Sequence, residues 1–356
     1  MRILLLGGSS FLGRAFASEA LARGHEVTTF TRGRSYADLP GVEAIRGERD
    51  SADDLTQLVE GRHWDAVVDT SAQQPAQTVI SARLLREHAD RYTFVSSVHA
   101  FADWPGQVVN EESPLHPCPA DTPADQPFSN ALKAGCERAV LEHFGAGRTL
   151  ILNSGLLIGP YETGGRLPWW LERMARGGPV LAPGDPERAM QVIDVRDFAA
   201  FGIGVVTAGH TGRYLTTAPA GNVTFGGFLA TCREVAGEPS DGRPRAELVW
   251  VEDGPLLAEG PDSVQPWLEL PLWAPDIPEM AAVWLADTAR AQEAGLRCRP
   301  FAETARDTWA WLQQREPAED TNADGLKGRK GAHHLQGIVP AKEQRLLAAL
   351  GTTDAE

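Results

Sequence analysis

The N-terminal part of the chain alternates short apolar runs with amphipathic segments. Residues 1–6 are mainly apolar, residues 7–13 are rich in glycine and serine, residues 14–23 have the apolar spacing of a helix, and residues 26–30 form a second apolar run. Short continuous apolar runs are typical of strands buried on both faces of a parallel sheet. A strand, a glycine-rich turn, a helix and a second strand within about 30 residues predict a βαβ unit of the dinucleotide-binding kind.

The alternation continues along most of the chain. Strands are expected in residues 42–50 (running into a loop), 64–70, 92–97, 150–160, 191–195, 214–217 and 246–251, and helices in residues 52–59, 78–88, 127–140, 224–236, 301–311 and 341–350. This pattern predicts an α/β fold with a doubly wound parallel sheet (Rossmann) and a smaller C-terminal substrate-binding lobe. The core is expected in residues 1–160 with returning segments 189–217, the lobe in 161–188 and 218–315, and a mobile linker and terminal helix in 316–356.

Composition narrows the class of protein. The 356 residues carry a formal net charge of −15, which argues against a nucleic-acid or anionic-membrane partner because like charges repel. No targeting segment or membrane span is visible, so a cytoplasmic location is expected. The four scattered cysteines lack metal-ligand spacing and are expected to be reduced thiols, with no metal site. The sequence leaves the oligomeric state open.

The glycine-rich turn is the first candidate binding element. Small residues let the backbone approach a pyrophosphate, whose charge suits the N-terminus of the following helix. The residues expected to contact the cofactor here are Gly7, Ser9, Ser10, Phe11 and Leu12. Gly13 is expected to permit close packing between the helix and the strand. An empty Rossmann scaffold is the alternative interpretation.

Two arginines follow the second predicted strand. A carboxylate at this place binds the ribose hydroxyls of NAD, whereas arginine suits the 2′-phosphate of NADP. Arg32 and Arg34 stand there and no carboxylate does. The cofactor is therefore expected to be NADPH, and solvated surface arginines are the alternative.

The motifs identify a family resemblance. The spacing Gly7…Ser10…Gly13 resembles the Gly-x-x-Gly-x-x-Gly turn of the short-chain dehydrogenase/reductase superfamily, with Ser10 in place of the middle glycine. Over roughly residues 1–315 the chain resembles the extended, NAD-dependent epimerase/dehydratase-like branch of that superfamily, and segments 267–273 and 295–300 resemble actinobacterial reductases of this type. The resemblance implies that Glu48 meets the adenine amino group. It also implies cofactor contacts by Arg49, Thr70, Ser71, Ala72, Lys133, Gly155 and Leu156.

The same resemblance assigns catalysis and exposes one departure. Ser97 stands where a serine or threonine binds the substrate oxygen, although a strand-terminal serine can instead bond the backbone. Relatives carry Tyr-x-x-x-Lys on the next helix, with tyrosine as proton donor. Here Lys133 is present but Ser129 replaces the tyrosine, and a serine hydroxyl is a far weaker acid than a phenol. Either catalysis is lost and the dinucleotide is only bound, or the proton comes from water, His99 or an acidic substrate hydroxyl.

The expected substrate follows from that departure. A chain that keeps the lysine but lacks the tyrosine resembles ketoreductases of angucyclinones. The resemblance implies NADPH-dependent reduction of an aromatic polyketide ketone in antibiotic biosynthesis. Such a reduction is possible without a tyrosine because the substrate has acidic hydroxyl groups of its own. Expected substrate contacts are His99, Trp104, Phe128, Ser129, Tyr161 and Trp169, of which Phe128 is as well explained by core packing. A nucleotide-sugar epimerase or dehydratase using NAD and a non-catalytic dinucleotide sensor are the alternatives.

Overall fold

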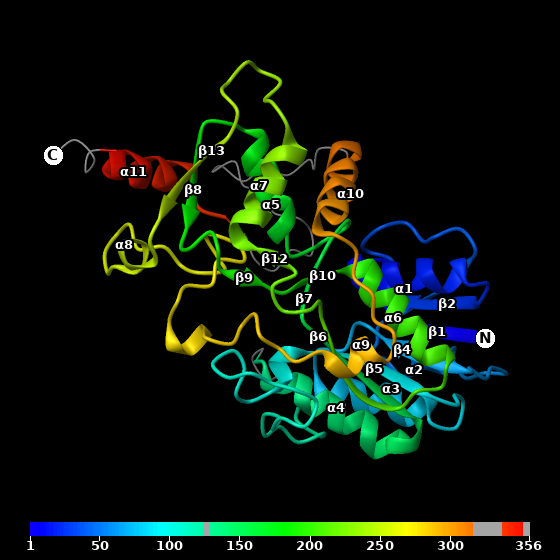
Figure 1. The fold of residues 1–356 in the computed structure, drawn as a ribbon. Coiled ribbons are helices and arrows are strands. Elements are labelled where there is room, and N and C mark those ends of the chain that lie inside the picture. The colour runs from blue at the N-terminus through cyan, green and yellow to red at the C-terminus, as the bar shows by residue number, and fades with distance from the viewer. Residues whose placement is uncertain (124–128, 316–336, 352–356) are drawn as a thin grey trace. The chain divides into compact units, whose positions relative to one another are not determined.

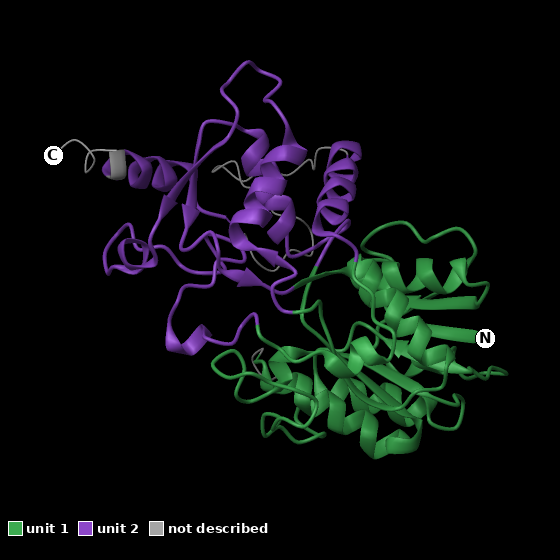
Figure 2. Ribbon diagram, in the orientation of Figure 1, with its two compact units in different colours: residues 1–157, 192–219, 285–298 green, residues 158–191, 220–284, 299–356 purple. Residues whose placement is uncertain are grey.

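A computed structural model describes residues 1–123, 129–315 and 337–351 of the chain. Phe128 and residues 316–336 of the predicted linker lie outside the described residues. The chain divides into two compact units (Figure 2): the first contains residues 1–157, 192–219 and 285–298, and the second contains residues 158–191, 220–284 and 299–356. The substrate-binding role expected of the second unit stays a prediction.

The first unit is built on a seven-stranded sheet with the order β11-β6-β5-β4-β1-β2-β3 (Figure 1). Its strands are β1 (Arg2–Leu6), β2 (Glu26–Thr31), β3 (Val42–Arg46), β4 (Ala66–Asp69), β5 (Tyr92–Ser97), β6 (Thr149–Ser154) and β11 (Gly212–Thr216). Every neighbouring pair is parallel. The doubly wound α/β fold expected from the sequence is confirmed.

Helices cover both faces of this sheet, which explains why its central strands β1 and β4 are apolar on both sides. The first face is packed by α1 (Phe11–Ala22) and α6 (Val195–Thr207), where the rings of Phe16 and Phe198 meet edge to face with centroids 5.9 Å apart. The opposite face is packed by α2 (Ala52–Thr56), α3 (Pro75–Leu85) and α4 (Ala131–Phe144).

Short elements complete the first unit. They are η1 (Val98–Ala100), η2 (Ala146–Arg148), β10 (Val192–Asp194) and α9 (Ala289–Glu293), and β10 pairs with β7 (Leu156–Ile158), whose last residue is the first of the second unit. The segment with α9 was expected in the lobe, but it packs beside β11, where Thr288 Oγ1 donates to the carbonyls of Leu215 and Thr217, 3.1 Å away in each case.

The second unit contains more helix than sheet. Its helices are α5 (Arg166–Ala175), α7 (Phe225–Ala236), α8 (Asp253–Leu257), η3 (Pro278–Met280), α10 (Phe301–Gln314) and α11 (Pro340–Gly351), and its strands are β8 (Pro179–Pro183), β9 (Ala189–Met190), β12 (Val223–Thr224) and β13 (Glu247–Val251). Strand β13 pairs in parallel with β8, and β12 pairs antiparallel with β9. Helix α11 covers the segment expected to form a terminal helix.

Candidate functional site

The predicted site residues of the first unit gather at one edge of the sheet. Because all seven strands are parallel, the turns that follow β1, β2, β3, β4, β5 and β6 emerge on the same side. The chain order reverses where β1 lies between β4 and β2. In open α/β sheets, ligands bind outside the carboxyl ends of the strands at such a switch point.

The glycines of the turn stand where there is no room for a side chain. Gly7 and Gly8 have φ angles of 105° and 135°, which favour glycine. A Cβ on Gly13 would lie 2.4 Å from the backbone nitrogen of Gly8, so the start of α1 crosses the turn in direct backbone contact. A Cβ on Gly7 would lie 2.5 Å from Thr70 Oγ1. Together with the unpaired N–H groups at the start of a helix, this geometry fits a dinucleotide pyrophosphate.

Ser10 is the N-cap residue of α1, and Phe11 and Leu12 form its first turn, while Ser9 is buried within the preceding turn. The carbonyl of Ser9 accepts a hydrogen bond of 3.3 Å from the backbone N–H of Tyr36, in the loop after β2. This bond ties the turn to the segment that carries the two predicted 2′-phosphate ligands.

The charged residues after β2 and β3 lie together on the surface. Arg34 Nη2 is 2.6 Å from Glu48 Oε1, and both side chains are exposed. Arg32 follows β2 directly and is also exposed. An exposed ion pair contributes little to stability and opens easily, so the Arg34–Glu48 pair leaves both groups able to turn toward a ligand. Their cofactor contacts stay predictions.

The guanidinium of Arg49 forms an ion pair with the buried carboxylate of Asp69. Its Nη1 and Nη2 donate to Asp69 Oδ1 and Oδ2 at 3.1 and 2.9 Å, and Nη1 also donates to Ser71 Oγ at 2.8 Å. Tyr92 donates its hydroxyl to Asp69 Oδ2 at 2.8 Å. Burial acts to raise the pKa of Asp69, but the charge and hydrogen bonds of Arg49 outweigh it and the pKa falls below its ordinary value. Asp69 is therefore an ionised anchor beneath the edge of the sheet.

The same carboxylate shapes the turn after β4. Asp69 Oδ1 accepts hydrogen bonds of 3.1 Å from the backbone N–H groups of Ser71 and Ala72. Thr70 Oγ1 donates to the carbonyl of Leu6 at 3.2 Å, which joins this turn to the end of β1. The turn thus brings the predicted cofactor residues Thr70, Ser71 and Ala72 next to Gly7.

Lys133 on α4 contacts this turn. Its Nζ donates to the carbonyl of Ala72 at 2.8 Å and lies 3.5 Å from the carbonyl of Val95. Burial lowers the pKa of Lys133, against the opposing influence of Cys136 and Asp69. Ser129 is exposed, and its carbonyl accepts from the N–H of Leu132 at 3.2 Å. Sequence reasoning missed Asp69, although an acidic residue ending an apolar strand is a signal for a buried, paired carboxylate.

Ser97 ends β5 and caps η1. Its Oγ accepts a hydrogen bond of 3.3 Å from the backbone N–H of His99. This is the bond to the backbone that was expected as the alternative to binding of the substrate oxygen. The hydroxyl proton is not used in that bond and can still be donated to a ligand. The rings of His99 and Trp104 meet edge to face with centroids 4.4 Å apart. These three predicted residues therefore lie close together beyond β5.

Gly155 and Leu156 follow β6. The residues beside them, Thr217 and Arg213, were not predicted from the sequence as part of the site. A Cβ on Gly155 would lie 2.4 Å from Thr217 Oγ1, and that hydroxyl is buried with no hydrogen-bond partner among the described residues. Behind them, Arg213 on β11 donates to Asn153 Oδ1 at 2.6 Å and to Glu137 Oε2 at 2.5 Å. The cluster fixes α4, and hence Lys133, against β6.

Tyr161 and Trp169 belong to the second unit. Tyr161 has a φ of 68°, unusual for a residue with a side chain, and its ring lies 5.3 Å from that of Trp311. Trp169 packs edge to face on Trp170 with centroids 4.6 Å apart. Their contacts with substrate stay predictions.

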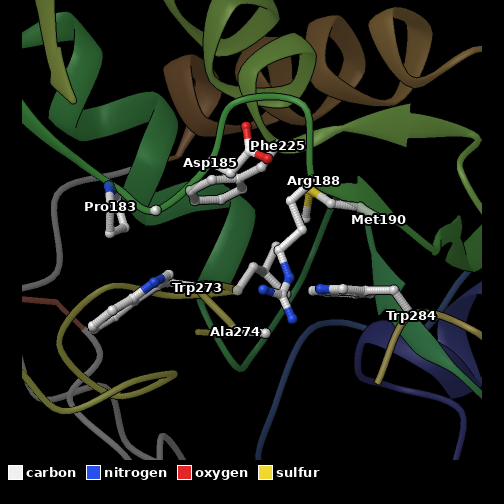
Figure 3. Close-up of a pocket in the computed structure, with 10 residues that line it drawn as sticks. Pro183, Asp185, Arg188, Met190, Phe225, Trp273, Ala274 and Trp284 are labelled. Carbon is white, nitrogen blue, oxygen red and sulfur yellow. The ribbon is translucent and has the colours of Figure 1, made fainter. Parts of the chain in front are cut away.

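The second unit also contains a small aromatic pocket (Figure 3). Phe225, Trp273 and Trp284 line it with Met190, and Arg188 extends toward the space between the two tryptophans. Its volume is about 10 Å³, which holds roughly one water molecule. An aromatic ligand does not fit this pocket in the described conformation.

Comparison with known proteins assigns the family. Residues 3–215 match the NAD dependent epimerase/dehydratase family. The chain belongs to this family. This confirms the branch expected from the glycine-rich turn and makes a nicotinamide dinucleotide the cofactor type of the family, without distinguishing NAD from NADP. Among the described residues, no helix is long and apolar enough to cross a membrane.

Two curated relatives are similar over part of their length. The chain is 31% identical over 205 residues to 2′-dehydrokanamycin reductase of Streptomyces kanamyceticus, covering 56% of each chain. It is 22% identical over 253 residues to chloroplast stem-loop binding protein of 41 kDa b of Arabidopsis thaliana, covering 67% of this chain and 64% of the relative. The chain thus spans less than two thirds of the length of either relative.

Solved structures share the fold at low identity. The enzyme WbmH of Bordetella bronchiseptica, in complex with NAD⁺, gives a TM-score of 0.64 at 17% identity, covering 88% of this chain and 98% of that one. The UDP-glucose 4-epimerase of Thermus thermophilus, in complex with NAD, gives 0.62 at 17% identity, covering 88% and 99%. These similarities establish the fold.

Proposed function

We propose that the protein is an NADPH-dependent ketoreductase that reduces a ketone of an angucyclinone-like aromatic polyketide in antibiotic biosynthesis. The observation that carries the proposal is at the start of α4. Lys133 Nζ is held against the turn after β4, while the position one helical turn earlier is an exposed serine. The cofactor-positioning lysine is retained and the family's phenol is absent. The resemblance to the angucyclinone ketoreductase of simocyclinone biosynthesis rests on the same combination.

The choice of NADPH rests on Arg32 and Arg34. When bound, the reduced nicotinamide would supply the hydride; the protein would hold the adenosine phosphate through these guanidinium groups. Hydrogen bonds to charged groups contribute roughly 1.5–3 kcal/mol each. We therefore expect Arg32→Ala and Arg34→Ala to weaken NADPH binding by about tenfold to 100-fold and to leave NADH binding nearly unchanged, measured by fluorescence titration. Equal losses for both cofactors would contradict the 2′-phosphate role.

Other tyrosines of the first unit are poor substitutes for the missing phenol. Tyr92 is committed to Asp69, and burial raises its pKa well above the ordinary value. Tyr214 lies on β11 with its hydroxyl 2.7 Å from His210 Nδ1, and burial also raises its pKa. We propose that Ser97 donates a hydrogen bond to the substrate carbonyl and that a phenolic hydroxyl of the substrate supplies the proton.

A matched pair of substrates tests this proposal. We expect NADPH consumption at 340 nm with hydroxylated polycyclic aromatic ketones, and a rate about 10²–10⁴-fold lower when the hydroxyl beside the ketone is methylated. Tyr36→Phe and Tyr161→Phe test the two remaining phenols: each variant keeps the ring and loses only the hydroxyl, so each should keep the wild-type rate. No consumption with any such ketone would overturn the proposal. A large loss in either tyrosine variant would assign the proton to the protein instead.

Specific observations favour other candidates. The similarity to 2′-dehydrokanamycin reductase favours reduction of a dehydrokanamycin-like ketone, and turnover of such a ketone in the same assay would support it. The structural neighbours favour a nucleotide-sugar epimerase or dehydratase, which tightly retained NAD⁺ after purification would support. Cofactor binding without turnover of any ketone would support a dinucleotide sensor. In each case we propose a small molecule, not nucleic acid or membrane, as the partner.

A further inference from the structure

The loop after β2 carries the two arginines proposed to hold the 2′-phosphate, and a third arginine contacts its backbone. Arg46 is the last residue of β3, which pairs with β2 so that Thr31 lies opposite Arg46. The side chains of Arg32 and Arg34 are exposed. The contacts that fix the backbone between them therefore decide where their guanidinium groups can reach.

A single hydroxyl connects Arg46 to this loop. Thr31 Oγ1 accepts a hydrogen bond of 2.7 Å from Arg46 Nη1 and one of 3.2 Å from the backbone N–H of Gly33. Thr31 itself is buried. Since Gly33 lies between Arg32 and Arg34 in the sequence, this link holds the backbone between the two exposed arginines to the end of β3.

Arg46 also packs directly against Gly33. This glycine has a φ of 68°, in the left-handed region, and a Cβ there would lie 2.9 Å from Arg46 Nε and 3.4 Å from Arg46 Cζ. No side chain fits between the guanidinium and the backbone of the turn. Both Nη1 and Nη2 of Arg46 also donate to the carboxylate of Asp38, further along the same loop. Arg46 thus contacts the chain before, within and after the turn that carries the exposed arginines.

The later part of the loop is fixed to the glycine-rich turn and to α1. The backbone N–H of Tyr36 donates to the carbonyl of Ser9, and Arg14 Nη1 donates to the carbonyl of Ala37 at 3.0 Å. The loop is therefore held to β3 by one set of contacts and to the start of α1 by another. A backbone fixed in this way reduces the conformational entropy that is lost when flexible arginine side chains bind a phosphate.

We propose that Arg46 is a positioning residue that makes the protein select NADPH over NADH. Its two terminal nitrogens already donate to Thr31 and Asp38, so it acts through the turn and not as a ligand of the phosphate. NADH carries a hydroxyl in place of the 2′-phosphate, so its binding depends little on this turn. The inference rests on the proposed function, in which Arg32 and Arg34 hold the phosphate.

Fluorescence titration with NADPH and with NADH tests the proposal. Arg46→Met keeps the apolar part of the side chain and removes every donor. We expect it to weaken NADPH binding about tenfold, as for the loss of one hydrogen bond to a charged group, and to change NADH binding by less than about twofold. Arg46→Lys keeps the charge without the planar fork and should recover part of the preference. Arg62→Met breaks a different arginine–carboxylate pair of β3, with Glu43 at 2.8 Å, and should leave both affinities unchanged.

A double-mutant cycle tests the link through the hydroxyl. Thr31→Val removes the acceptor that joins Arg46 to Gly33 and should lower the preference for NADPH as well. Because both changes break the same link, the double variant should bind NADPH about as Arg46→Met does. Additive losses in the double variant, or equal losses for the two cofactors in Arg46→Met, would overturn the proposal.

Two further measurements separate the possible failures. If the wild type binds NADH as tightly as NADPH, the 2′-phosphate role of Arg32 and Arg34 fails, and the role of Arg46 fails with it. If the wild type prefers NADPH and Arg46→Met keeps that preference, only the role of Arg46 fails. The melting temperature of Arg46→Met should stay close to that of the wild type, because the pair with Asp38 is partly exposed. A large decrease would show that the variant loses cofactor through a destabilised fold and would also overturn the proposal.

Discussion

A single buried carboxylate, that of Asp69, connects the end of β4 to three other parts of the first unit. It accepts from Arg49 after β3, from Tyr92 on β5, and from the backbone of the turn that contacts Lys133. Arg49 lies in the loop after β3, and β3 is not a neighbour of β4 in the sheet. The position of Lys133 therefore depends on a charge pair that never needs to touch the substrate.

Replacing Asp69 by Asn tests this dependence. The change leaves the buried guanidinium of Arg49 without its counter-ion, and breaking a buried pair in this way costs about 3–5 kcal/mol. We expect the urea midpoint to fall accordingly and cofactor affinity to fall with it. Asp241→Asn, which breaks an exposed pair, should leave the midpoint unchanged. Equal effects of the two variants would contradict a buried ionic anchor.

The same carboxylate predicts the response of stability to acid. The pKa of Asp69 is lower in the folded protein than in the unfolded chain. Its contribution to the free energy of unfolding is therefore complete above an ordinary aspartate pKa and is lost as the pH falls through the lowered value. Urea midpoints measured from pH 7 to pH 3 should decrease more steeply for the wild type than for Asp69→Asn. Parallel curves would show that the pKa of Asp69 is the same in the folded protein and in the unfolded chain.

At the scale of elements, the crossing of α1 over the glycine-rich turn sets the geometry of the cofactor edge. Gly13→Ala would place a methyl group 2.4 Å from the nitrogen of Gly8, and the backbone must move to admit it. Alanine favours a helix over glycine by up to about 1 kcal/mol, but overpacking costs typically about 1–3 kcal/mol. We expect a net loss of stability and a weaker affinity for the dinucleotide.

Gly147→Ala is the matched control for that prediction. Gly147 lies in η2, and a Cβ there meets nothing within 4 Å. Thermal melting and cofactor titration should be unchanged in this variant. If Gly13→Ala also behaved as the wild type in both measurements, the close backbone contact would have no role in binding.

The elements of the first unit were largely predictable because both faces of its central strands are buried. The strand expected at 92–97 has those bounds, and the strand expected at 26–30 extends by one residue. The strand expected at 214–217 is β11, which runs from Gly212 to Thr216. Its first residues were not predicted because a charged residue, Arg213, interrupts the apolar pattern. Arg213 is tolerated there because Glu137 and Asn153 bind it.

The candidate site was predictable only where a motif is local. The turn at residues 7–13 and the position of Lys133 follow from short spacings that any reader of the sequence can recognise. The pairs Arg49–Asp69 and Arg173–Glu343 join residues that are 20 and 170 positions apart. Such pairs depend on the tertiary fold, which periodicity does not reveal.

At the scale of the whole molecule, α11 is held to the second unit by side-chain charges. Glu343 pairs with the buried Arg173, Lys342 lies 2.8 Å from Glu269, and Arg345 lies 2.8 Å from Asp262. These contacts come from widely separated parts of the sequence, and the first of them is almost inaccessible to water. The C-terminal helix is thus part of the folded unit.

Glu343→Ala should loosen that attachment. Removing the carboxylate leaves Arg173 buried and unpaired, at a cost of about 3–5 kcal/mol. We expect a lower urea midpoint and faster amide hydrogen exchange in α11. Arg345→Gln breaks an exposed pair and should lower the midpoint by at most about 1 kcal/mol. Unchanged exchange in Glu343→Ala would show that α11 is held by other contacts.

The path of the chain between its two units limits how the protein can be divided. The polypeptide passes from one unit to the other after residues 157, 191, 219, 284 and 298. A nested series of shortened genes would therefore yield no fragment that contains all of one unit without segments of the other. Obtaining one unit alone would require deletion of internal segments and rejoining of the cut ends. During synthesis on the ribosome, the first unit is complete only after residue 298 and the second only after the segment that follows.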